Sequence, residues 1–143
     1  MRSVPLQTGS VRYVRGVVHY SRLSDVVVDV PAGDHDGEMA FWSAATGQTR
    51  ARLGRHPEYH RIKLPGQDVG LLIQQLGDGL SRVHLDIHTD DLDAEVSRLE
   101  RLGAERIKKV HDWWIMRDPA GLLFCVVPRP PESFNDTNAH QWE

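Results

Sequence analysis

The stretch Val83-His84-Leu85-Asp86-Ile87-His88 alternates apolar and polar side chains, which is typical of a strand with one face in a core. A helix should follow, because Asp90 suits an N-cap and apolar residues recur at helical spacing: Leu92, Val96, Leu99 and Leu102. Gly103 fits the left-handed cap that ends such a helix. Extended segments are expected next at residues 105–110, 113–117 and 122–127. The second half of the chain is therefore predicted to be a βαβββ unit.

The first half of the chain shows the same order of elements. Asp25–Pro31 is a β-branched run that predicts a strand, and a helix over residues 36–46 should end at Gly47. Extended segments are expected at residues 48–53, 59–64 and 69–76. Val28-Asp29-Val30 repeats the pattern of Leu85-Asp86-Ile87 at an offset of 86 − 29 = 57 residues.

This repeat predicts an α+β fold of two βαβββ modules that form paired curved sheets around a cleft. One unit of this size cannot bury its sheet face alone, so we expect two four-stranded sheets to bury their concave faces against each other. The alternative is an ordinary α+β domain in which the similarity arose by chance. The expected parts are an N-terminal extension (1–23), the two modules (24–79 and 80–128) and a polar C-terminal tail (129–143). Prolines after Val127 should end the compact domain near Pro128.

Composition excludes several classes of protein. A formal net charge of −3 over 143 residues gives no reason to expect nucleic acid or an anionic membrane as a partner. No apolar run approaches the roughly 20 residues of a membrane span, and the N-terminus does not resemble a secretion signal. The single Cys125 excludes an internal disulfide. We therefore expect a cytoplasmic protein.

Three stretches carry a family resemblance: Ala40-Phe41-Trp42 followed by Gly47, the whole of residues 83–103, and the ending Arg117-Asp118-Pro119-Ala120-Gly121-Leu122-Leu123-Phe124-Cys125-Val126. Together with the paired βαβββ order, they resemble the glyoxalase-like branch of the glyoxalase/bleomycin-resistance/extradiol dioxygenase superfamily, also called vicinal oxygen chelate proteins. The resemblance covers roughly residues 25–128. It implies a small-molecule ligand in a cleft and a homodimer. Some members are metal-dependent lyases, dioxygenases, epimerases or thiol transferases, and others bind an antibiotic without chemistry.

The resemblance also implies where a divalent metal (Zn, Ni, Fe or Mn) would take its ligands, on the first and last strands of each module. His84 stands at the ligand position of the second module's first strand. Its last strand has Cys125 where the family has Glu, and an inert buried thiol is the favoured interpretation. The first module offers two pairs of alternatives, Gln74 or Gln75 on its last strand and Asp25 or Val27 on its first. We therefore expect no complete family metal site.

Other residues are candidates for contact with the ligand. Asp29 and Asp86 should both face the cleft, for acid–base work or simply to pair with an arginine. His88 shares the face of His84 and Asp86, and Trp114 is a candidate stacking surface, with core packing or a dimer seam as its alternative. A basic group on the middle strands of the first module favours a solvated sheet edge over a site for an acidic ligand: Arg50, Arg52, Arg55, His56, His60, Arg61 and Lys63.

Three functions follow from these residues. The first is a small-molecule-binding protein whose ligand contacts His84, Asp86, Asp29, Gln74 and Trp114. The second is a divalent-metal-dependent lyase, isomerase or dioxygenase in which His84 is a ligand. The third is a metal-free acid–base enzyme that uses Asp86, His84 or Asp29. The sequence favours the first.

Overall fold

The computed structural model describes residues 18–52 and 59–143. Outside this description lie residues 1–17, Arg55 and His56, and the side chains of Arg50, Arg52 and Tyr59. The elements are β1 (His19–Pro31), α1 (His35–Thr46), β2 (Arg50–Arg52), β3 (Tyr59–Ile62), β4 (Gly70–Leu76), β5 (Arg82–Thr89), α2 (Leu92–Arg101), β6 (Glu105–Val110), β7 (Trp113–Arg117), β8 (Leu123–Pro128), a 3-10 turn (Pro131–Ser133) and β9 (His140–Trp142). The paired βαβββ order is thereby confirmed.

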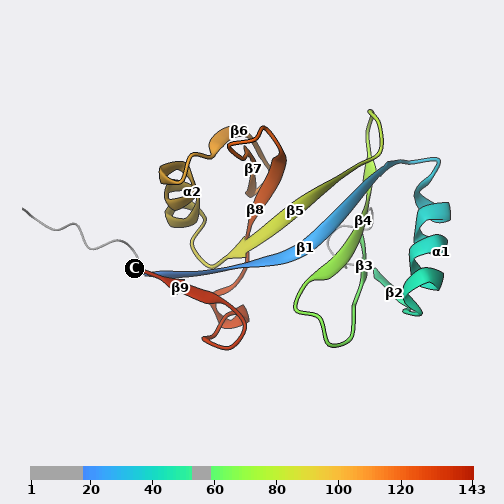
Figure 1. Ribbon diagram of the computed structural model, residues 1–143, viewed down its shortest axis with the longest axis horizontal. Coiled ribbons are helices and arrows are strands. Elements are labelled where there is room, and N and C mark those ends of the chain that lie inside the picture. Colours follow the sequence, from blue (N-terminus) through green and yellow to red (C-terminus); the bar gives the residue numbers. More distant parts are fainter. Residues whose placement is uncertain (1–17, 53–58) are drawn as a thin grey trace, which may run out of the picture.

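The eight module strands form one continuous mixed sheet in the order β2-β3-β4-β1-β5-β8-β7-β6. Each module places its first strand beside its last one in a parallel pair, and the two first strands, β1 and β5, join the modules as an antiparallel pair. In Figure 1 these two strands run side by side across the centre, with α1 at one end and α2 at the other. The predicted α+β fold of two βαβββ modules with curved sheets is confirmed, and the modules meet edge to edge through β1 and β5 rather than by packing one concave face on the other.

The register of the β1–β5 pair places the two halves about a pseudo-twofold axis. Val27 lies opposite His84, and the offset of 57 residues that aligns the two aspartates also aligns these two residues, since 84 − 27 = 57. In the parallel pairs, Asp29 lies beside Gln74 and Asp86 lies beside Cys125. The sequence repeat is thus a structural one, and Val27 rather than Asp25 is the counterpart of His84.

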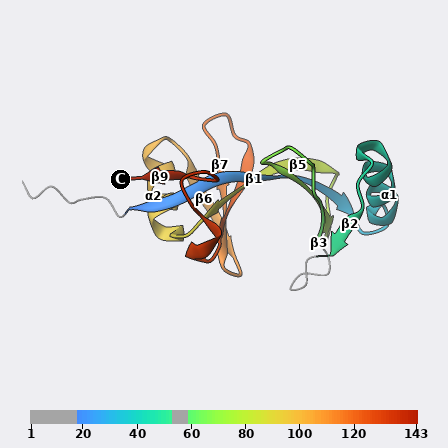
Figure 2. The same cartoon turned by 90° about the horizontal axis from the view of Figure 1, so that it is seen from below.

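Each helix covers one module on the same side of the sheet. Val30 and Ile73 pack with Met39 of α1, and Val126 and Met116 pack with Val96 of α2. In Figure 2 the two helices lie at opposite ends of the molecule, with β1 running between them. Alternate residues of β1 and β5 therefore point to a sheet face that no described helix covers, which we call the helix-free face.

The helix caps differ in detail from the expectation. Asp91, not Asp90, caps α2, because its Oδ1 accepts a hydrogen bond of 3.0 Å from the Ala94 amide. Asp90 instead accepts a hydrogen bond of 2.7 Å from the Tyr20 amide of β1. Gly103 takes a φ of 102°, in the left-handed region expected for the end of the helix.

Residues after Pro128 return to the domain. β9 pairs with the start of β1, the Trp142 indole donates a 2.7 Å hydrogen bond to Ser21 Oγ, and the Arg98 guanidinium lies 3.7 Å from the centre of the Trp142 ring. The expectation that the compact domain ends near Pro128 is therefore wrong, because these aromatic and polar contacts continue the sheet beyond the prolines. None of the described helices is long and apolar enough to span a membrane.

Candidate functional site

Five ionisable side chains from β1 and β5 gather on the helix-free face: Asp25, Asp29, His84, Asp86 and His88. We call them the polar cluster. They share a face because residues two apart in a strand point the same way, and because Asp25 lies opposite Asp86 in the ladder. All are buried residues except His84, which is partly buried. Buried ionisable groups are costly unless paired, so the contacts within the cluster decide its chemistry.

His84 is the centre of the cluster. Its Nδ1 hydrogen bonds to Asp29 Oδ2, and its Nε2 lies 3.2 Å from Asp86 Oδ1. Burial opposes a charge on this ring, but its contacts with Asp29, Asp86 and Cys125 outweigh burial and raise the pKa of His84 to about 12. His84 is thus an imidazolium held between two carboxylates at neutral pH.

The surroundings of Asp25 disfavour the charged form of its carboxyl group. Burial raises its pKa, the Arg61 guanidinium lowers it, and the facing Asp86 raises it again, with a net rise. Arg61 reaches Asp25 from β3 with an Nη2–Oδ1 distance of 3.0 Å. The guanidinium passes over Gly70, where a Cβ would lie only 2.6 Å from both Arg61 Nε and Asp25 Oδ1. A side chain at position 70 would therefore collide with this ion pair.

His88 behaves in the opposite way to His84. Its Nε2 lies 3.5 Å from Asp25 Oδ2. Burial, and then the positive charges of Arg129, Arg22 and Arg61, lower the pKa of His88 to about 3. Its ring is therefore neutral at physiological pH and offers a lone pair. Arg22 lies opposite His88 because a register shift between Leu23 and Asp25 turns the start of β1 over.

The structure brings together three of the predicted ligand contacts, His84, Asp86 and Asp29. Gln74 lies beside Asp29 on β4 and is partly buried. Trp114 is not brought to the cluster: it packs against the α2 core with Arg106 5.2 Å from its ring centre. The basic group is divided between faces, since Arg61 reaches Asp25 while His60 lies 3.3 Å from His35. Sequence reasoning missed Arg22, the pairing of Arg61 and the need for Gly70.

The residues at the family's metal positions do not fit a metal. They are Val27, Gln74, His84 and Cys125, aligned by the shared register. Val27 has no donor atom, and both ring nitrogens of His84 face carboxylates. Burial raises the pKa of the Cys125 thiol more than His84 lowers it, so the thiolate that a metal needs is disfavoured.

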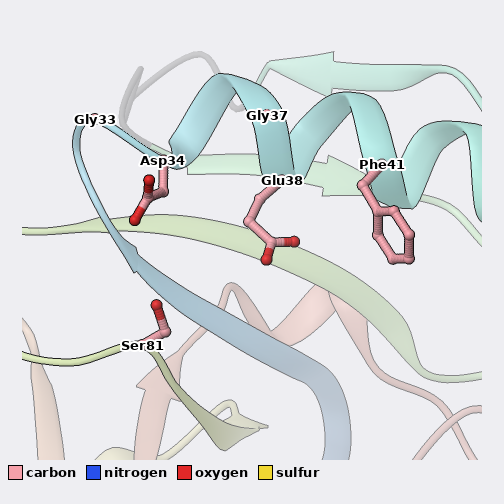
Figure 3. Close-up of a pocket in the computed structure, with 6 residues that line it drawn as sticks. All are labelled: Gly33, Asp34, Gly37, Glu38, Phe41 and Ser81. Carbon is pink, nitrogen blue, oxygen red and sulfur yellow. The ribbon is translucent and has the colours of Figure 1, made fainter.

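A separate hollow of about 370 Å³ lies beside α1 (Figure 3). Its lining includes Asp34, Glu38 and Phe41 of the helix region and Ser81 before β5, and none of the polar cluster. The two carboxylates carry no described basic partner, and no buried ionisable group enters it. The hollow is therefore not the favoured ligand-binding site.

Comparison with known proteins gives the family. Residues 25–127 match the glyoxalase-like domain, which is 103 of the 143 residues. None of the curated proteins matches the chain. Similar solved structures share its fold at low identity. Methylmalonyl-CoA epimerase from Mycobacterium tuberculosis is 15% identical, with a TM-score of 0.56 over 78% of this chain and 89% of that one.

Two further solved structures have a fold similar to that of this chain. A hypothetical protein from Bacillus halodurans C-125 is 9% identical, with a TM-score of 0.58 over 80% of this chain and 99% of its own. A structure described as an NAD-dependent benzaldehyde dehydrogenase from Legionella pneumophila is 8% identical, with a TM-score of 0.57 over 72% and 97%. At such identities the structures show the fold alone. From the extent of the sequence match, the chain belongs to the glyoxalase-like domain family.

Proposed function

We propose that the protein binds a small molecule at the polar cluster, through hydrogen bonds and ion pairs rather than through a metal ion. His84, Asp29 and Asp86 are the principal contacts, and Gln74 is at the edge of the site. The resemblance places the metal ligands of the family on the first and last strands of each module. The proposed site lies on the same strands but uses a different set of side chains. Trp114 is left out because it belongs to the α2 core.

One observation carries this proposal. Asp25 Oδ1 and Asp86 Oδ1 are buried, and neither has a hydrogen-bond partner among the described residues, although Arg61 and His84 lie near enough for ion pairing. A buried acceptor left without a hydrogen bond costs about 1–3 kcal/mol. A ligand that donates hydrogen bonds to these oxygens would recover that free energy. We therefore expect a small polar molecule with hydroxyl or amino groups.

A binding experiment on chelator-treated protein tests the proposal. Polyols, hydroxy acids and small amines are screened by thermal shift, and the compounds that stabilise the protein are titrated by calorimetry. Asp86→Asn should weaken the binding by about tenfold or more, the effect of losing a charged hydrogen bond of about 1.5–3 kcal/mol. The matched control is Asp112→Asn, at an exposed turn. Equal binding by both variants would show that the ligand does not contact the cluster.

A second candidate function is a divalent-metal-dependent lyase, isomerase or dioxygenase of the vicinal oxygen chelate type. It is favoured by a donor group of His84, Asp86 and Cys125, whose ligand atoms lie within 4.8 Å of one another. A metal there would act as a Lewis acid on vicinal oxygens of a substrate. Metal analysis separates the candidates: a stoichiometric metal that is lost in His84→Ala supports the enzyme, and a metal that this variant retains excludes it.

We also infer a homodimer. Val83 and Leu85 are 61% and 43% exposed and lie on the same face of β5 as Ile87, which packs against the α2 core. Exposed apolar residues that adjoin one another mark protein interfaces. Light scattering should give twice the chain mass, and Leu85→Glu should reduce it to one chain. Leu122→Glu, at an exposed apolar residue of the β7–β8 turn, is the control.

A cytoplasmic location is the remaining inference. Cys125 is a free thiol, and unpaired thiols persist in a reducing compartment. Cell fractionation with antibodies against the chain tests this location. Recovery of the protein in the secreted fraction would contradict it.

A further inference from the structure

A second group of donor atoms lies beside the family's metal positions, along the same two strands. Asp25 is two residues before Val27 on β1, and Asp86 and His88 are two and four residues after His84 on β5. One donor atom from each of the three residues lies within 4.8 Å of the others. The three residues are 3%, 8% and 4% exposed. Such burial distinguishes the group from the exposed acidic clusters that are common on protein surfaces.

We propose that Asp25, Asp86 and His88 form a binding site for a divalent transition-metal ion, displaced along β1 and β5 from the family's metal positions. Two carboxylates and one imidazole suit Zn²⁺, Fe²⁺ or Mn²⁺. Three protein ligands also leave a coordination position for a water or a small molecule. The site goes beyond the proposed small-molecule binding and does not rest on it.

The oxygen atoms of the group are available to a metal. Arg61 holds Asp25 Oδ1, which leaves Oδ2 toward His88 Nε2 at 3.5 Å. Asp86 Oδ1 has an ion-pair contact of 3.2 Å with His84 Nε2 but accepts no hydrogen bond from a described residue. Asp25 and Asp86 stand opposite each other in the ladder, an arrangement in which two like charges are destabilising. A cation between them would remove this repulsion.

The neighbouring donor group of His84, Asp86 and Cys125 is less suitable. Nδ1 of His84 is already bonded to Asp29, and Nε2 faces Asp86, so a metal would have to displace these contacts. Cys125 would contribute a buried thiol rather than a carboxylate. Among the described residues, the contact of His88 Nε2 is the loose one of 3.5 Å with Asp25 Oδ2, which a metal could displace easily.

Three arginines repel a metal ion at this site. Their repulsion is weaker than the attraction of Asp25 and Asp86. Arg22, Arg61 and Arg129 place positive charge near His88. Arg129 is exposed and the other two are partly exposed, so solvent and salt screen them. Asp25 and Asp86 would bind the ion directly from a buried position, where screening is weak.

Cobalt(II) chloride, added to the full-length protein after dialysis against a chelator, tests the site. We expect saturation at one ion per chain, with visible d–d bands and without the thiolate-to-cobalt charge-transfer band that Cys125 would give. His88→Gln and Asp25→Asn should each weaken binding by at least roughly tenfold, the loss that even an outer-shell partner causes. Cys125→Ser, and His111→Gln at an exposed histidine, should bind as the wild type does.

Near-ultraviolet circular dichroism in chelator confirms that each variant is folded. Unchanged cobalt affinity in both His88→Gln and Asp25→Asn overturns the proposal, as does a thiolate band that Cys125→Ser removes. No saturable binding by the wild type also overturns it. None of these results affects the organic-ligand titration, which is carried out in chelator, so failure of the metal site and failure of the proposed function are distinguishable.

Discussion

Asp25 and Asp86 lie directly opposite each other across the antiparallel β1–β5 pair, with both carboxyl groups buried on the helix-free face. The two strands come from different modules, so the repeat itself creates this facing pair. Each carboxyl group has one stabilising neighbour on its other side, Arg61 for Asp25 and His84 for Asp86. The facing pair of aspartates is therefore flanked by a basic group on each side, along the joint between the modules.

Removing the Asp86 charge should lower the pKa of Asp25. Asp86 raises that pKa through repulsion, while burial of Asp25 is unchanged in Asp86→Asn. Carbon-13 NMR of the aspartate carboxyl groups, recorded against pH in chelator, measures the change. An Asp25 pKa that rises or does not move in this variant would show that the two carboxyl groups do not sense each other.

Gly70→Ala should destabilise the protein by about 1–3 kcal/mol, the usual cost of overpacking. The new methyl group would lie 2.6 Å from Arg61 Nε and from Asp25 Oδ1 and would force the ion pair apart. Urea unfolding measures the free energy change. The matched control is Gly37→Ala in α1, where no atom lies within 4 Å and alanine should add about 0.5–1 kcal/mol through helix propensity. A stable Gly70→Ala protein would mean that the ion pair is not held over this glycine.

His84 should make the protein lose stability as pH rises above neutrality. Its folded pKa of about 12 exceeds the ordinary histidine pKa of 6.5, so its contribution is complete below pH 6.5 and decreases as pH rises toward 12. The loss approaches about 1.4 kcal/mol per pH unit for one proton. Urea unfolding at pH 7, 8 and 9 in chelator should show this slope in the wild type and a shallower one in His84→Gln. Identical slopes would mean that the ring is not an imidazolium in the folded protein.

Glu95 should make the stability of the folded protein depend on pH in the acidic range. It is fully buried in α2, accepts two hydrogen bonds from Arg98 and lies 2.7 Å from His19 Nε2. Burial raises its pKa, but the hydrogen bonds from Arg98 and His19 outweigh burial and lower it overall. Its contribution is therefore present above its unfolded pKa of about 4.5 and is lost as pH falls through the folded value.

Glu95→Gln should accordingly cost about 1–3 kcal/mol at pH 7, because the amide leaves Arg98 without a carboxylate. The same variant should lose less stability than the wild type between pH 5 and pH 3. Urea unfolding across this range measures both effects. Glu100→Gln, whose exposed carboxylate pairs with Arg106, is the control and should change stability little. A wild-type protein no more acid-sensitive than Glu95→Gln would contradict the assignment.

The fold and part of the site could be predicted because they follow from periodicity. The offset between Asp29 and Asp86 predicted the repeat, and the alternation around His84 placed it on one face with Asp86 and His88. These inferences need only that strand side chains alternate and that equivalent units fold alike.

The rest depends on contacts that the sequence pattern does not encode. The register shift near Leu23 places Arg22 beside the polar cluster, opposite His88. No residue type in the sequence predicts that shift. Trp113 and Trp114 must point to opposite faces of the sheet, but the sequence does not predict which of them packs against α2. Trp142 follows a polar stretch, and its contacts with Ser21 and Arg98, together with the pairing of β9 with β1, explain why this segment returns to β1.

The most direct test of the central claim, that ligands bind at the polar cluster, is nitrogen-15 NMR of the histidine rings during ligand titration. A compound found in the screen should shift the ring signals of His84 and His88 and leave those of the exposed His111 and His140 unchanged. Ring signals of His84 and His88 that stay constant at saturating ligand would contradict the claim, because the ligand would then occupy another part of the molecule.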